Sequence, residues 1–215
     1  MVDRRWLVIV TLGWMAMIAA RSAVAIESGE QLLLWMLMQQ LWLICGSLQA
    51  VRQASVLRWD RKDLGKGVLI GVGLFAAIVL INLTTISCLR LVFSEVQVQQ
   101  WLMREQTGVQ MLLSIKNAAK FWLAAVSITI GASVSEELFF RGAILKAFCH
   151  VMPTKWAVFL GALAFAGVHF YLVQFIPVLV SGIILGVLFV KSNNLVSTMA
   201  AHATVNTLAL VAHIL

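Results

Sequence analysis

Long apolar segments constrain the fold of this chain more than any other feature of its sequence. A transmembrane helix needs about 20 mostly apolar residues. Seven candidate segments of this kind are Trp6–Ala20, Gln31–Val51, Gly67–Leu89, Phe121–Phe148, Trp156–Leu172, Gln174–Val190 and Leu195–Leu215. Lipid offers no hydrogen-bond partner to an open strand edge, so such segments cross a bilayer as helices. We therefore expect an all-α, polytopic transmembrane helix bundle with about seven spanning helices.

The composition excludes a soluble enzyme. Hydrophobic residues make up 61% of the 215 positions and charged residues only 12%, whereas soluble domains average roughly 45–50% and about 25%. The net charge of +7 does not require nucleic-acid binding as its explanation, because the cytoplasmic loops of membrane proteins are rich in Lys and Arg. The expected partner is therefore the lipid bilayer, and no nucleic acid is expected.

The basic residues of the loops predict the orientation. With the N-terminus inside, the inner loops hold Arg4, Arg5, Arg52, Arg58, Arg61, Lys62, Lys66, Lys146, Lys155 and Lys191, and the outer loops hold Arg21, Arg90, Arg104, Lys116 and Lys120. The positive-inside rule thus favours a cytoplasmic N-terminus. The start of the chain also resembles a signal peptide with a cleavage site at Ala23–Ala25, but we favour an uncleaved first span.

One stretch between the spans is polar. Residues 90–120 carry loosely spaced apolar positions on one face, including Trp101 and Leu112, which is typical of a helix lying along the membrane surface. We expect residues 1–117 to hold the first spans and this interfacial segment, and residues 118–215 to hold the chemistry. The pairs Gly67/Gly71 and Gly182/Gly186 have GxxxG spacing, which predicts close helix packing.

Acidic residues are scarce in the second half, where only Glu136 and Glu137 follow Glu105. Ionisable groups within a bilayer are costly and usually functional. Glu137 and Arg141 stand four residues apart, with the acid first, which is the better orientation for a helical ion pair. Glu136 points about 100° away from Glu137, which leaves it without this partner. One interpretation is that both acids share one arginine and only stabilise the fold. We favour the other, in which one acid is structural and the second is reactive.

Two later helices carry further polar residues at helical spacing. His202 and Asn206 are four residues apart, so both face one neighbour, either as a polar clamp between helices or as two donors of an oxyanion hole. Phe165 and His169 also share a face, so the phenyl ring would shield the histidine from lipid. Beside an embedded Glu136, His169 is a candidate for helping to activate water.

These motifs resemble a known family. Glu136-Glu137-x-x-x-Arg141, Phe165-x-x-x-His169 and His202-x-x-x-Asn206 follow one another in the order of the three signature motifs of the CPBP or Abi family. That family includes the type II CAAX prenyl endopeptidases and bacteriocin-processing enzymes. All three motifs lie within Ala118–Leu215, so the resemblance covers less than half of the chain.

The resemblance implies an intramembrane endopeptidase, similar to the type II CAAX protease, that works without a metal or other cofactor. Glu136 would be the general base, His169 would orient the water, and His202 with Asn206 would stabilise the oxyanion. Glu137 and Arg141 would support the helix, and Phe165 the histidine. The expected substrate is a peptide or membrane-associated protein, and the expected location is a bacterial cytoplasmic membrane.

Two alternatives remain open at this level. Glu136, His169 and His202 together would form a His₂Glu zinc site with an open position, although no HExxH motif is present. The chain would otherwise be a non-catalytic factor of the same family, either a bacteriocin self-immunity protein or a scaffold that regulates a partner. A channel or transporter is a further class, but no inverted repeat is visible.

Overall fold

The computed structural model describes residues 2–52, 56–58 and 60–215, and within these ranges the regular structure is entirely helical. Trp59 and the middle of the basic loop before it lie outside the described residues. The helices and π-helical turns are α1 (Arg4–Ser22), α2 (Gly29–Val51), α3 (Arg61–Val92), α4 (Glu95–Leu113), α5 (Ala118–Val126), η1 (Ser127–Gly131), α6 (Ala132–Glu136), η2 (Glu137–Leu145), α7 (Lys146–Cys149), α8 (Thr154–Gly167), α9 (Phe175–Ser192) and α10 (Leu195–Ile214). The predicted all-α class is confirmed.

Five of the helical segments are long and apolar enough to cross a bilayer. They are α2, α3, the continuous stretch Ala118–Cys149, α9 and α10. α8 is a shorter apolar helix of 14 residues, and α1 has 19 residues with arginines at both ends. Each of the seven predicted segments contains a helix, but two of them are not among these five. The third helix begins at Arg61, six residues before Gly67, and the fifth ends at Gly167 rather than near Leu172.

Apolar side chains cover the outside of the bundle. On α3, the exposed fractions of Leu69, Leu80 and Leu83 are 74%, 66% and 59%. A soluble protein would bury such a row, whereas lipid solvates it. This surface and the five long apolar helices indicate an integral membrane protein.

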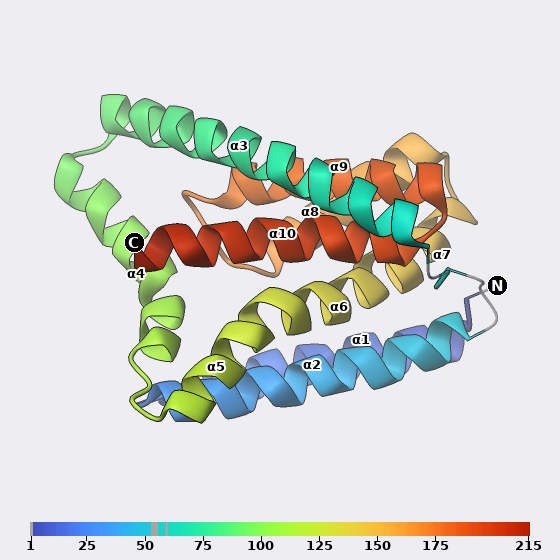
Figure 1. Cartoon of the computed structure of the whole chain (residues 1–215), viewed down its shortest axis with the longest axis horizontal. Coiled ribbons are helices and arrows are strands. Elements are labelled where there is room, and N and C mark those ends of the chain that lie inside the picture. Colours follow the sequence, from blue (N-terminus) through green and yellow to red (C-terminus); the bar gives the residue numbers. More distant parts are fainter. Residues whose placement is uncertain (1, 53–55, 59) are drawn as a thin grey trace.

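The chain from α5 to α7 is one continuous helix that runs through the centre of the bundle. Figure 1 shows it passing between the α1–α2 pair and α10. Two π-helical turns, η1 and η2, interrupt it. Such turns are rare and are frequent at functional sites. The second begins at Glu137, so the first motif lies where the helical pitch changes.

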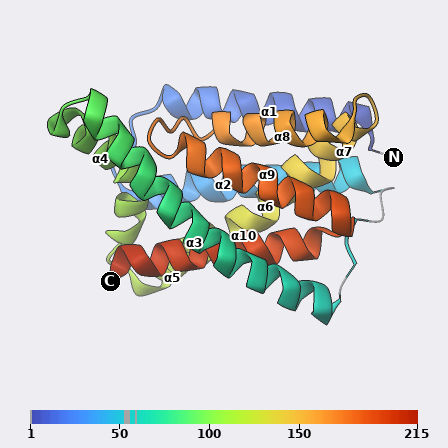
Figure 2. The same ribbon diagram turned by 90° about the horizontal axis from the view of Figure 1, so that it is seen from above.

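Glycines let the neighbouring helices approach closely. A Cβ atom on Gly67 or Gly71 would collide with backbone carbonyl oxygens of α10, and one on Gly182 would press against Ala162 of α8. α3 therefore packs directly on α10, and α9 on α8, as Figure 2 also shows. Both GxxxG predictions are confirmed. α3 packs on one side of α10, and His202 of α10 contacts Glu137 of the central helix.

The start of α10 is fixed by Asn194, which is fully buried. Its side chain accepts a hydrogen bond from the Val196 N–H as the N-cap of the helix and donates to Arg58 O at 2.8 Å and Asp63 Oδ2 at 2.6 Å. N-cap side chains satisfy backbone donors that the first helical turn leaves free. These bonds fix the position of α10 along its own axis, and with it the position of His202.

Candidate active site

The two adjacent glutamates face different environments. The Glu137 carboxylate is fully buried and accepts from Arg141 Nη1 at 2.7 Å. The Glu136 side chain retains 22% of its exposure and lies at the junction of α6 and η2. The ion pair that the spacing predicts is therefore formed by Glu137, and Glu136 keeps an accessible carboxylate.

His202 lies between the two carboxylates. Its Nδ1 is 2.9 Å from Glu137 Oε1, and its Nε2 is 3.8 Å from Glu136 Oε2. An ionised carboxylate only accepts hydrogen bonds, so Nδ1 carries a proton and donates it to Glu137. Glu137 thus fixes the orientation of the imidazole and leaves Nε2 directed toward Glu136.

Phe165 is the apolar centre of the site. Its ring contacts those of His169 and His202 edge-on, with centroids 4.8 Å and 5.9 Å away. The Arg141 guanidinium lies over the same ring, 4.5 Å from its centroid, which is a cation–π contact. Arg141 also donates from Nη2 to Gly182 O at 3.2 Å. Phe165 therefore joins the three motifs into one cluster.

His169 does not lie on a helix, in contrast to the prediction. α8 ends at Gly167, and His169 occupies the connection to α9. Its Nδ1 is 2.7 Å from Phe165 O. A carbonyl oxygen only accepts, so Nδ1 is the protonated nitrogen, and Nε2 of the neutral ring presents a lone pair. The bond to Phe165 O thus leaves His169 a second nitrogen that can accept a hydrogen bond from water.

Asn206 contacts the central helix at its first π-helical turn. Its Nδ2 donates to Ile128 O at 3.1 Å, and Gln40 Nε2 of α2 donates to Ser127 O at 2.9 Å. A π-helical turn shifts the backbone pairing, and these two amides supply donors to carbonyl oxygens within η1. An amide nitrogen has two N–H bonds, so Asn206 has a second donor besides the one used on Ile128 O.

Two further residues lie at the site that the sequence patterns did not single out. Tyr171, in the connection from α8 to α9, has its ring centroid 5.5 Å from that of His169. Burial raises the pKa of its phenol, and the carboxylates of Glu136 and Glu105 raise it further. Glu105 of α4 binds the backbone of the same connection. The only sequence signals were that Tyr171 is the sole tyrosine and Glu105 the last acid before Glu136.

The zinc alternative requires Glu136, His169 and His202 to surround one point. Within the described ranges, no three His, Cys, Asp or Glu side chains gather in a way that could hold a metal ion. The Nδ1 atoms of His169 and His202 lie against Phe165 O and Glu137, and such contacts are also usual for histidines that bind a metal through Nε2. The requirement for a metal is therefore a question for the purified protein.

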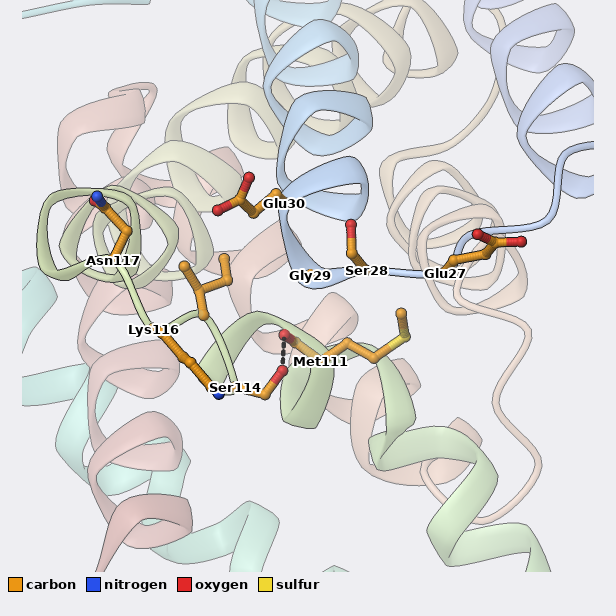
Figure 3. A pocket seen from close by; sticks show the side chains of 9 residues that line it. Glu27, Ser28, Gly29, Glu30, Met111, Ser114, Lys116 and Asn117 are labelled. Atoms are coloured by element: carbon orange, nitrogen blue, oxygen red, sulfur yellow. Dashed lines mark hydrogen bonds between the residues drawn. The ribbon is translucent and has the colours of Figure 1, made fainter.

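Pockets are also present outside the cluster of motif residues. Figure 3 shows a pocket of ≈ 400 Å³ between the start of α2 and the connection from α4 to α5, where Glu30 and Asn117 are among the lining residues. None of the motif residues lines it. A second, apolar groove of ≈ 220 Å³ lies between α1, η2 and α8, and Phe139, Phe140 and Phe170 contribute to its wall. This groove directly adjoins the helix that carries Glu136.

A comparison with known families finds a match for part of the second half of the chain. Residues 118–208 match the model of the type II CAAX prenyl endopeptidase Rce1-like family. The match contains all three motifs and the cluster described above. No curated protein and no solved structure matches the chain. The resemblance drawn from the motifs is thereby confirmed for this segment.

Proposed function

We propose that this protein, whose residues 118–208 match the model of the type II CAAX prenyl endopeptidase Rce1-like family, is an intramembrane endopeptidase that hydrolyses a peptide bond with water activated by Glu136. The observation that carries the proposal is the difference between the two glutamates. Glu137 is sealed in an ion pair, whereas Glu136 is 22% exposed and faces a histidine. A reactive carboxylate must be reachable from outside the packed core, and of these two glutamates Glu136 is the one that is partly exposed.

The reaction begins with a water molecule held by Glu136 and by Nε2 of His169. Glu136 takes a proton from the water as the oxygen attacks the carbonyl carbon of the substrate, and a tetrahedral oxyanion forms. The C–N bond then breaks, and the leaving amine receives the proton from Glu136. His169 suits its part because the bond from Nδ1 to Phe165 O leaves Nε2 free to accept.

The oxyanion is stabilised by His202 and Asn206. Nε2 of His202 donates to it when the ring is an imidazolium, because Nδ1 is already engaged with Glu137. The second N–H of Asn206 is the other donor. Two donors that converge on a developing charge are worth far more away from water than in it.

The substrate is a peptide or the tail of a membrane-associated protein. The apolar groove beside η2, walled by Phe139, Phe140 and Phe170, supports an apolar segment of substrate within the bilayer. The protein resides in a bacterial cytoplasmic membrane with its N-terminus inside. The excess of basic residues in the loops on that side supports this orientation, and the termini lie at opposite ends of the bundle (Figure 1).

The test compares peptide profiles of membranes from cells that carry the intact protein, the Glu136→Gln variant or a matched control, Glu95→Gln. Glu95 is an exposed acid on α4 that pairs with Arg90. We expect products that depend on the intact protein and on the control, and that disappear with Glu136→Gln at equal protein level. Identical profiles for all three would reject the endopeptidase and favour an immunity or scaffold role.

The absence of a metal requirement is part of the proposal and has its own test. The purified protein is expected to carry zinc well below one equivalent and to keep its activity in the presence of a chelator. Stoichiometric zinc, lost together with activity, would replace this mechanism by a metal-dependent one.

A further inference from the structure

Glu105 makes a set of contacts that its place in the sequence does not suggest. Its carboxylate accepts three consecutive backbone N–H groups, from Leu172 at 2.6 Å, Val173 at 2.8 Å and Gln174 at 3.1 Å. These residues directly precede α9, whose own N-cap residue Gln174 makes no side-chain cap. Glu105 comes from α4, 67–69 positions earlier in the chain, and therefore fixes the segment that leads into α9 from another helix.

A carboxylate is well matched to this position. Its two oxygens can accept all three N–H groups of this non-helical segment, and the positive end of the α9 dipole just after it attracts an anion. Figures 1 and 2 both place α4 at the same end of the bundle as the connection between α8 and α9. α4, otherwise a polar helix outside the motif cluster, is thus joined to the site by one side chain.

The connection that Glu105 binds carries His169 and Tyr171 and contains a strained residue. Phe170 has a φ of 54°, in the left-handed region that bulky residues rarely adopt. Its side chain is 77% exposed, so packing of the ring does not hold it there. The restraints lie on either side, at the His169–Phe165 bond and at the three bonds to Glu105.

We propose that Glu105 is a positioning residue, which holds residues 168–174 so that His169 keeps its place against the Phe165 ring of the motif cluster. Removal of its carboxylate frees three backbone N–H groups at once and lets the strain at Phe170 relax, which turns His169 away. This inference rests on the proposed function, because it assigns to Glu105 the placement of the histidine that orients the water. Strain of this kind at functional sites persists only where neighbouring contacts enforce it.

The test uses Glu105→Ala and the closer mimic Glu105→Gln, with Glu95→Gln as the control on the same helix. Hydrogen exchange of the Leu172, Val173 and Gln174 amides reports on the contact itself. Tyr171 is the only tyrosine, so a single ¹³C-labelled tyrosine ring resonance reports on the connection. We expect faster exchange and a shifted resonance in Glu105→Ala, an intermediate effect in Glu105→Gln, and none in the control.

The kinetic measurement uses a peptide that spans a cleavage site found in the membrane profiles. We expect kcat to fall by up to about 10²-fold in Glu105→Ala, which is the effect of misplacing a reacting group by about 1 Å, with KM little changed. Glu105→Gln should recover part of kcat, because its amide oxygen still accepts.

The outcomes separate this inference from the proposed function. Unchanged amide exchange in Glu105→Ala would overturn the contact. Faster exchange with unchanged kcat would overturn the positioning role while leaving the endopeptidase intact. A Glu136→Gln variant with full activity would instead reject the proposed role of Glu136, and the exchange data would still decide whether Glu105 holds the connection.

Discussion

Replacement of Arg141 by methionine is expected to destabilise the fold strongly, because it leaves the Glu137 carboxylate buried without its cation. The Glu137 side chain is 0% exposed and that of Arg141 is 3%, with 2.7 Å between Nη1 and Oε1. Methionine keeps most of the apolar bulk of arginine, so little cavity is created. Removal of one partner of a buried ion pair costs about 3–5 kcal/mol.

The uncompensated charge accounts for part of this cost, and it is the part that a second substitution can test. The bond from Arg141 to Gly182 O and the contact with the Phe165 ring are each worth only about 1–2 kcal/mol. A second substitution, Glu137→Gln, removes the stranded charge. The double variant should therefore lose less stability than the two single variants combined, with a coupling of about 2 kcal/mol.

The assay is reversible unfolding in mixed micelles, followed through the fluorescence of the eight tryptophans. Arg90→Met is the matched control, because Arg90 also pairs with a glutamate, Glu95, but at an exposed site. Exposed pairs contribute little, so its unfolding midpoint should stay unchanged. The reasoning is refuted if Arg141→Met unfolds like the control, or if the effects of the Arg141 and Glu137 substitutions are additive.

Two further substitutions test packing and electrostatics. Gly71→Leu should lower the yield of folded protein on size exclusion, because a side chain there collides with Ala201 O of α10. The control Gly73→Leu places its side chain in open space and should leave the yield unchanged. Equal yields for the two variants would contradict the packing of α3 on α10. Glu136→Gln should lower the pKa of Tyr171, because loss of a nearby negative charge makes tyrosinate easier to form. An NMR titration of the single labelled tyrosine measures this, and curves identical to those of the intact protein would place Glu136 too far away.

Much of the site was predictable because it depends on helical spacing. The Glu137–Arg141 pair and the close approach at Gly71 and Gly182 follow from residues four positions apart. Helical geometry alone places such side chains on one face. The spanning helices were predictable for a related reason, since lipid requires long apolar segments to be helical.

The unpredicted features depend on contacts between distant segments. The π-helical turns η1 and η2 have no local sequence signal, and the bonds that η1 accepts come from Gln40 and Asn206, far away in the chain. Helix α8 stops at Gly167 although apolar residues continue, and the bond from Glu105 helps to hold the segment that follows. Hydropathy does not distinguish such a segment from a helix.

The most direct test of the central claim is the turnover rate of the folded Glu136→Gln variant on a peptide taken from the membrane profiles. Glutamine preserves the size of the side chain but cannot take a proton from water. Because a positioned general base contributes about 10²–10⁴-fold, we expect kcat to fall by that factor while the unfolding midpoint stays close to that of the intact protein. A kcat equal to that of the intact protein would show that Glu136 is not the base and would contradict the mechanism.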